Sequence, residues 1–236
     1  MHCIFSDRLN KLRVHNREIF LRHFHDKQRP LITVSNHDSC IDDPFLWGGL
    51  IGMRELRGHL SRMRWTPAAH DICFTTSLMN YYFSLGRCIP IVRGNGVYQK
   101  ALDFCIERLN NGHWVHMFPE GKVNMTPGER SRIKWGIGRI IAECRVSPVV
   151  LPVWHVGMER VFPVPTPRPP LPKIGNNVTV LFGEPIPYEK LLSTLRKQAA
   201  CPRDIRKALA DRVQNRLYEL ETRAVALHRQ YFPAAV

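Results

Sequence analysis

Short runs of consecutive hydrophobic residues recur along the chain, and each ends in a polar or Gly/Pro-containing segment. The first run is Leu31–Ser35, which follows Pro30 and is rich in β-branched residues. The other runs are Ile89–Val92, Trp114–Phe118, Val149–Val153 and Val178–Phe182. Continuous apolar runs of this length are typical of strands that are buried on both faces of a sheet. We therefore expect a strand at each of these positions.

Helical periodicity separates these predicted strands. Apolar residues fall on one helical face in Val97–Asn111, which stops before Gly112, and again in Ile133–Cys144. A longer apolar stripe follows Pro202 and predicts an amphipathic helix over about residues 203–230, which packs on the domain or lies on lipid. Alternating strands and helices predict an α/β fold with a mixed, largely parallel sheet flanked by helices.

The chain has 236 residues, of which 44% are hydrophobic and 23% charged, as expected for a folded globular protein and not for a disordered one. We expect a single domain over residues 1–236, with a motif-bearing core at about 28–185. The proline-rich segment Pro163–Lys173 is interpreted as an extended connection between strands, although such segments also bind proline-recognition modules.

A formal net charge of +14 favours an anionic partner. Nucleic acid is disfavoured as that partner because the sequence contains no zinc-finger spacing, no aromatic RNA-binding strand and no basic region followed by heptads. An anionic membrane surface is the better prediction. The oligomeric state is not addressed by the sequence.

No stretch approaches the ~18–20 consecutive apolar residues that a membrane-spanning helix needs, and the first twenty residues are too polar for a signal peptide. We therefore expect a protein that lies on a membrane or dips into it. The apolar stretches Pro44–Met53 and Ile72–Leu85 are candidates for this contact, and core helices are the alternative interpretation of both. Seven scattered cysteines, without a C-x-x-C pair, indicate neither a disulfide framework nor a zinc site.

The segment after the first predicted strand, NHDSCIDD, concentrates groups that can transfer protons. A neutral His37 can accept a proton from a hydroxyl, and Asp42 can fix its tautomer from the other ring nitrogen. One alternative makes Ser39 or Asp38 a helix N-cap and leaves His37 on the surface.

A metal site is the competing functional interpretation of the same segment. His37, Asp42 and Asp43 would be joined by His70 or His155, although no H-x-x-x-H spacing on a helix supports this set. The sequence contains no G-x-S-x-G elbow, so a covalent acyl-enzyme is not indicated. The cation in Arg93-Gly94-Asn95-Gly96 suits a phosphate.

Four motifs in this order resemble those of the glycerolipid acyltransferase family. They are the His37/Asp42 spacing, GRCIPIVR at Gly86–Arg93, FPEG at Phe118–Gly121 and VVLPV at Val149–Val153. The resemblance implies that His37 is the general base and Asp42 its orienting partner, with no cofactor. It also implies that Arg93 holds a lipid phosphate and that Glu120 and Gly121 position glycerol oxygens. Ser39 and Lys122 are further expected substrate contacts.

The segments KWGIGRIIAEC and LPVWHVGM are similar to one subgroup of this family, the transacylases that remodel cardiolipin in mitochondria. This similarity implies acyl exchange without coenzyme A, with cardiolipin, monolysocardiolipin and phosphatidylcholine as substrates. It further implies peripheral attachment to mitochondrial membranes that face the intermembrane space. An acyl-CoA-dependent transferase, a hydrolase and a catalytically silent lipid-binding protein are the alternatives.

Overall fold

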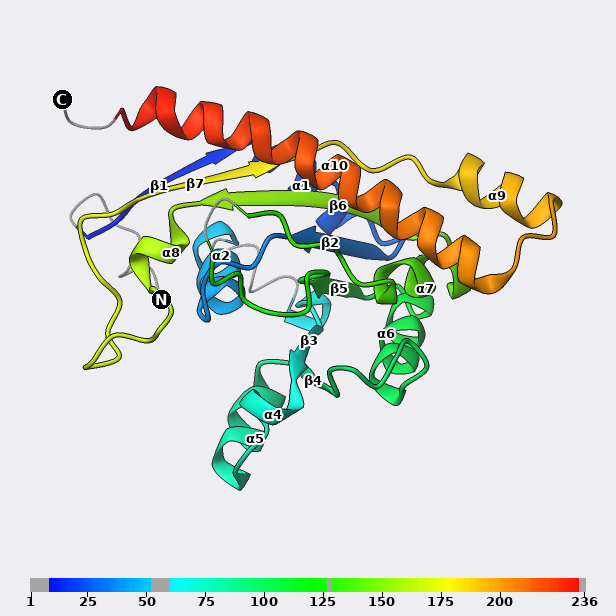
Figure 1. Ribbon diagram of the computed structural model, residues 1–236, viewed down its shortest axis with the longest axis horizontal. Coiled ribbons are helices and arrows are strands. Elements are labelled where there is room, and N and C mark those ends of the chain that lie inside the picture. Colours follow the sequence, from blue (N-terminus) through cyan, green and yellow to red (C-terminus); the bar gives the residue numbers. More distant parts are fainter. Residues whose placement is uncertain (1–8, 52–59, 127–128, 234–236) are drawn as a thin grey trace.

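The computed structural model describes residues 9–51, 60–126 and 129–233 and is built around a five-stranded sheet of order β1-β7-β6-β2-β5 (Figure 1). The strands are β1 (Lys11–His15), β2 (Leu31–Ser35), β5 (Trp114–Met117), β6 (Val149–Val156) and β7 (Asn177–Phe182). β2 is parallel to β5 and β6, β1 is parallel to β7, and only the β6–β7 pair is antiparallel. The predicted fold class, a mixed and largely parallel sheet, is confirmed.

Helices cover both faces of this sheet because successive side chains of the buried strands point to opposite sides. Leu31 of β2 packs with α1 (Arg17–His25), α2 (Asp42–Leu50) and the short α8 (Met158–Val161). Ile32 and Val34 belong to the core on the other face. That face is covered by α6 (Lys100–Asn110), α7 (Gly136–Glu143), α9 (Glu189–Lys197) and α10 (Pro202–Tyr231).

The long α10 crosses the outer side of the sheet over β6 and β7 and packs against α7 (Figure 1). Its predicted apolar stripe faces the domain, and the buried members are Leu209, Val213, Leu217, Leu220 and Ala224. The helix therefore packs on the domain, which was one of the two predicted placements. The contact with α7 is close: a Cβ at Gly138 would lie 2.1 Å from the backbone oxygen of Arg206.

A second, two-stranded sheet pairs β3 (Thr66–Ala69) with β4 (Cys88–Ile91). Between them the chain forms α4 (His70–Cys73) and α5 (Ser77–Leu85), and this unit projects from the β5 side of the molecule (Figure 1). A single bridge between Trp65 and Val115 connects it to β5, just after the 3-10 helix η1 (Leu60–Arg62). The run predicted at Ile89–Val92 is thus a strand, but it is not part of the main sheet.

The two apolar stretches that were candidates for membrane contact differ in burial. In Pro44–Met53, the side chains of Leu46, Trp47 and Leu50 belong to the core, so of the two interpretations the core helix holds for the described part. Gly52 and Met53 lie outside the described residues. In Ile72–Leu85, by contrast, several large apolar side chains are exposed. No helix in the described part of the chain is both long enough and apolar enough to cross a bilayer.

Pro163–Lys173 forms the connection between α8 and β7, as expected. All six cysteines within the described residues are free thiols.

Candidate active site

The segment between β2 and α2 brings His37 and Asp42 together, as the sequence predicts. β2 ends at Ser35 and α2 begins at Asp42, so the residues between them form one short loop. Nδ1 of His37 donates a hydrogen bond to Oδ2 of Asp42 over 3.0 Å. The backbone N–H groups of Asp38 and Ser39 donate to the same oxygen over 2.8 and 2.9 Å. The carboxylate fixes the His37 tautomer and leaves Nε2 for proton transfer.

Asp42 and His37 differ in burial and therefore in their chemistry. Asp42 is completely buried, whereas the His37 side chain remains 19% exposed and stacks on Phe118 at a centroid distance of 4.0 Å. Burial alone would raise the pKa of Asp42. The charge of His155 and hydrogen bonds from His155 and His37 outweigh this effect and hold that pKa well below its usual range. Asp42 is therefore a fixed anion behind an accessible imidazole.

The loop after β5 packs against the His37 loop because β5 is the parallel neighbour of β2. Oε1 of Glu120 accepts a hydrogen bond from the backbone N–H of His37 over 3.2 Å. The backbone N–H of Asn124 donates to the carbonyl oxygen of His37 over 2.6 Å. Burial, helped by the charge of Asp38, raises the pKa of Glu120 to about 7. The Glu120 carboxyl group thus lies beside the backbone of His37, in the loop that follows the neighbouring strand.

Gly121 follows with a φ of +75°, a backbone conformation that favours glycine. A Cβ at this position would lie 3.3 Å from the Lys134 side chain. Lys122 is exposed, and within the described residues its ammonium group has no ion-pair partner.

Ser39 has a structural role instead of the predicted contact with substrate. It is completely buried, and its hydroxyl donates a hydrogen bond to the carbonyl oxygen of Phe162 over 2.8 Å. The hydroxyl is therefore used to attach the His37 loop to the end of α8, and the expectation that it binds substrate is wrong.

Arg93 is not brought into this cluster in the way that the sequence predicts. The prediction assumes that all the motif-bearing strands share one sheet, so that their carboxyl ends meet at one edge. β4 belongs to the small sheet, and the guanidinium group of Arg93 pairs with Asp71 at the surface. The assumption of one shared sheet is therefore wrong for the strand before Arg93, and the phosphate contact of Arg93 stays a prediction.

Asp43 does not share the role of Asp42, although the two are adjacent. Nε of Arg64 donates to Oδ1 of Asp43 over 2.8 Å, a second guanidinium nitrogen donates to Oδ2, and the hydroxyl of Thr66 donates over 3.0 Å. This nearly buried pair links α2 to the segment that leads into β3. Within the described residues, no group of three or more His, Cys, Asp or Glu side chains has the arrangement of a metal site.

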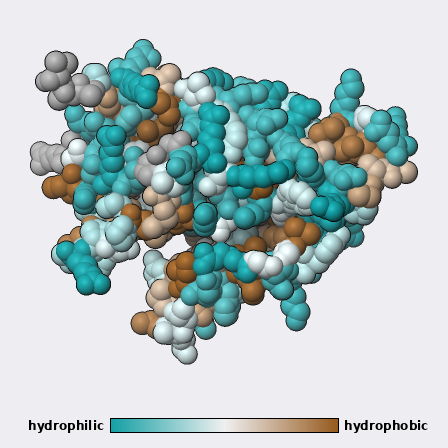
Figure 2. Space-filling model, viewed as in Figure 1, coloured by the Kyte–Doolittle hydropathy of each residue, from teal (hydrophilic) through white to brown (hydrophobic). Residues whose placement is uncertain are grey.

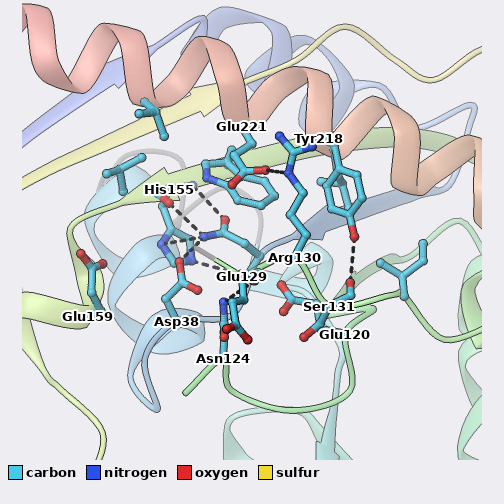
Figure 3. A pocket seen from close by; sticks show the side chains of 16 residues that line it. Asp38, Glu120, Asn124, Glu129, Arg130, Ser131, His155, Glu159, Tyr218 and Glu221 are labelled. Atoms are coloured by element: carbon cyan, nitrogen blue, oxygen red, sulfur yellow. Dashed lines mark hydrogen bonds and ion pairs between the residues drawn. The ribbon is translucent and has the colours of Figure 1, made fainter. Parts of the chain in front are cut away.

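A cavity of about 150 Å³ lies next to this cluster, between the β5–α7 loop and α10 (Figure 3). Its wall is rich in carboxylates, including Asp38, Glu120 and Glu221. Arg130 partly offsets them: its Nε pairs with Glu221 over 2.7 Å, and its guanidinium group lies over the Tyr218 ring. The cavity borders the site from the α10 side, and His37 is not one of its lining residues.

His155, at the end of β6, is a member of the site that the sequence identified only as a possible metal ligand. It is completely buried, and its Nε2 lies 3.4 Å from Oδ2 of Asp42. A polar residue within the otherwise apolar run Val149–Val156 is the signal that marks it. Asn36 was also missed, and its side chain bonds to both Asp38 and the backbone of His155.

Comparison with known proteins identifies relatives over most of the chain. The profile of the family described as Acyltransferase matches residues 11–156. Tafazzin from Drosophila melanogaster is 44% identical over 94% of this chain and 58% of its own length. N-acylphosphatidylethanolamine synthase from Arabidopsis thaliana is 41% identical over 76% of this chain and 64% of its own length. Tafazzin from Saccharomyces cerevisiae is 30% identical over 73% of this chain and 55% of its own length.

This chain thus spans roughly half to two thirds of the length of the curated relatives that it matches. The matched family region contains the His37 and Asp42 pair and both neighbouring strands, β5 and β6. The chain belongs to the acyltransferase family.

Proposed function

We propose that this protein is an O-acyltransferase that moves a fatty-acyl chain from a phospholipid to a lysophospholipid without coenzyme A. The observation that carries the proposal is the pair of an accessible His37 and a buried, anionic Asp42. An imidazole held in this way is suited to take a proton from a hydroxyl group. The relatives named tafazzin, one of them similar over 94% of the chain, support the choice of reaction.

In the proposed mechanism, Nε2 of His37 removes the proton from the free glycerol hydroxyl of the lysophospholipid. The resulting oxygen attacks the ester carbonyl of the donor phospholipid and forms a tetrahedral centre. When this centre collapses, the donor's glycerol oxygen leaves and takes the proton back from His37. One ester bond breaks and one forms, so no further reactant is needed. Asp42 stabilises the imidazolium that exists between the two proton transfers.

The residues around the pair have supporting roles in this proposal. Glu120, whose carboxyl group lies next to the His37 backbone, and the backbone of Gly121 position glycerol oxygens. The exposed ammonium of Lys122 contacts a lipid phosphate. Arg93 is half-exposed and contacts a phosphate at the membrane surface in exchange for its ion pair with Asp71.

The proposed substrates are phosphatidylcholine, cardiolipin and monolysocardiolipin, and the proposed location is the surface of mitochondrial membranes that face the intermembrane space. Support for these assignments comes from the similarity to tafazzin. The formal charge of +14 is consistent with a surface rich in an anionic lipid.

The proposed membrane contact is the face of α5 that carries Leu78, Tyr81, Tyr82 and Leu85. These positions are spaced i, i+3, i+4 and i+7, so they form one helical stripe, and each residue is 63–76% exposed. Ile72 of α4 adds a further exposed apolar side chain. Figure 2 shows hydrophobic residues on the part of the molecule that projects downward, where Figure 1 places α4 and α5. An exposed apolar stripe on a basic protein is suited to insertion between lipid head groups.

Product analysis with purified protein tests the proposed reaction. Vesicles would contain phosphatidylcholine with a labelled acyl chain and monolysocardiolipin, with no coenzyme A present. We expect label in cardiolipin, an equal amount of lysophosphatidylcholine and no net loss of ester. Acylation only after acyl-CoA is added would instead identify an acyl-CoA-dependent transferase, and free fatty acid as the main product would identify a hydrolase.

A second acceptor is favoured by one observation, the similarity to a relative named N-acylphosphatidylethanolamine synthase. The same base would then act on the amine of phosphatidylethanolamine and form an amide. Including phosphatidylethanolamine in the vesicles distinguishes the two, because the N-acyl product resists mild alkaline hydrolysis and the ester product does not.

A further inference from the structure

Asp42 has two histidine partners, and both approach the same oxygen atom. Nδ1 of His37 lies 3.0 Å from Oδ2, and Nε2 of His155 lies 3.4 Å from it. Among the described residues, the other oxygen, Oδ1, has no hydrogen-bond partner. A carboxylate oxygen shared by two donors is a weaker acceptor for each, so the state of His155 affects the hydrogen bond to His37.

His155 is held rigidly in this position. Its ring is completely buried, and its Nε2 also lies 3.1 Å from the carbonyl oxygen of Asn36. The Asn36 side chain accepts from the N–H of His155 over 3.0 Å and donates to its carbonyl oxygen over 2.9 Å. The second amide hydrogen of Asn36 goes to Asp38 over 2.6 Å. Nδ1 of His155 lies 3.5 Å from the same amide nitrogen, a longer contact than either of these.

The groups that face His155 favour its charged form. Burial would lower the pKa of His155, but the charge and hydrogen bond of Asp42, followed by the charge of Asp38, raise it to about 9. Glu120, in the loop after β5, adds a further carboxyl group. The nearby groups that could carry a positive charge are His116 of β5 and His37. Burial lowers the pKa of His116 to about 3, so His116 is neutral.

We propose that His155 is a positioning residue of the acyl-transfer reaction: its imidazolium shares Oδ2 of Asp42 with His37 and limits how strongly Asp42 holds the proton on the His37 ring. Without His155, Asp42 would bind the protonated form of His37 more strongly, and less of the free base would be present at a given pH. His155 itself does not reach the substrate. This inference rests on the proposed function, since it concerns the rate of the same transfer.

The test compares the pH dependence of transfer in wild-type protein and His155→Gln, a variant that keeps a hydrogen-bond donor but has no charge. We expect the acid limb of the kcat/KM profile to move to higher pH by about half a unit or more, because a positive charge next to Asp42 is lost. A half-unit shift lowers the fraction of free base by at most about threefold, so below the acid limb we expect kcat to fall about threefold while KM changes by less than about twofold.

His116→Gln is the matched control, because it also replaces a completely buried histidine. His116 of β5 forms a hydrogen bond over 2.8 Å with Thr33 of the neighbouring β2. Its acid limb should stay where it is in the wild type. A folded His155→Gln protein whose acid limb does not move, or moves only as far as that of His116→Gln, would overturn the proposal.

A second measurement does not depend on the folding of a His155 variant or on activity. In ¹⁵N-histidine-labelled protein at about pH 8, most histidines are neutral, so a ring with both nitrogens protonated stands out. We expect one such ring in the wild type and its loss in Asp42→Asn. Absence of this ring from the wild type would overturn the proposal. Wild-type protein without transfer activity that still shows the ring would contradict the proposed function and leave the His155–Asp42 interaction supported.

Discussion

Three carboxylates within the six residues Asp38–Asp43 have different partners, and these partners decide their chemistry. Asp42 bonds to two imidazoles and two backbone N–H groups, which makes it a fixed anion. Asp43, the next residue, is neutralised by the guanidinium group of Arg64 and has a structural role. Asp38 accepts from the Asn36 side chain and borders the cavity, and burial raises its pKa. Only Asp42 is therefore placed to orient a base.

Removal of the base should abolish most of the transfer without unfolding the protein. We expect His37→Ala to lose ~10²–10⁴-fold in transfer rate, the usual contribution of general-base catalysis, and Asp42→Asn to lose somewhat less. Labelled acyl transfer measures the rate, and circular dichroism checks the fold. His70→Ala is the control, because this exposed histidine was the alternative metal ligand and should be dispensable. A loss of less than about tenfold in folded His37→Ala protein would contradict the proposed mechanism.

Glu120 should make the stability of the protein depend on pH. Its pKa of about 7 in the folded protein lies above the ordinary value of 4.5. The stability that depends on neutral Glu120 is therefore fully present below about pH 4.5 and is lost as the pH rises through 7. Gln at this position is neutral at every pH and keeps an oxygen that can accept from His37. We therefore expect Glu120→Gln to be more stable than wild type at pH 8 by roughly 1–3 kcal/mol, with little difference near pH 4.5.

Urea denaturation at the two pH values measures this difference for Glu120→Gln. Glu129→Gln changes an exposed glutamate of the same loop and should alter the free energy of unfolding little at either pH. Equal stability of Glu120→Gln and wild type at pH 8 would mean that the Glu120 carboxylate is not penalised by burial.

At the scale of the elements, the sequence predicts best what is buried on both sides. β2 has the predicted bounds, and β5, β6 and β7 match within one to three residues, because these short, β-branched-rich apolar runs suit strands that are buried on both faces. The edge strand β1 was not predicted, since KLRVH is only partly buried and carries polar residues. The helix α1 was missed as well, although Phe20 and Phe24 belong to the core.

The same reasoning explains which parts of the site were predictable. His37 lies on the loop after β2 and Asp42 begins α2 five residues later, so their spacing alone indicates that they meet. Glu120 lies near them because β5 is the neighbour of β2. Strand pairing is a long-range property that a single sequence does not contain, so Arg93 was placed in the wrong sheet. The role of His155 depends on a contact with Asp42 across 113 positions, which only the packing of β6 beside β2 creates.

The contact between α7 and α10 should be sensitive to a single methyl group. A Cβ at Gly138 would lie 2.1 Å from the backbone oxygen of Arg206, and a backbone atom of a 30-residue helix cannot move aside easily. We expect Gly138→Ala to destabilise the protein by about 2 kcal/mol or more, even though alanine favours helix formation. Gly136→Ala, in the same helix, would meet only the flexible Leu102 side chain at 3.3 Å and should cost much less.

Thermal unfolding of the two variants distinguishes these expectations. Equal melting temperatures for Gly136→Ala and Gly138→Ala would show that α10 can shift away from α7 without loss of stability.

For the whole molecule, charge and exposed apolar surface act together. The excess of Lys and Arg over Asp and Glu attracts the protein to an anionic surface over a distance of about one Debye length. The α5 stripe can add a contribution from apolar burial, which salt does not screen. The cavity beside the site has the opposite character, because several carboxylates line it. An anionic surface should therefore bind the outside of the molecule and not this cavity.

We therefore expect two separable components in membrane binding, and cosedimentation with liposomes measures both. Binding of wild-type protein should strengthen with the fraction of anionic lipid and weaken as salt is raised to about 1 M, where the Debye length falls to about 3 Å. A salt-resistant remainder should persist, and Leu78→Ser/Tyr82→Ser should remove most of it, because both side chains belong to the exposed α5 stripe. Val146→Ser is the control, since this exposed residue lies before β6, away from α5. If Leu78→Ser/Tyr82→Ser binds at high salt as wild type does, the α5 stripe is not the membrane contact. Equal binding of wild-type protein to neutral and anionic vesicles would contradict the electrostatic component.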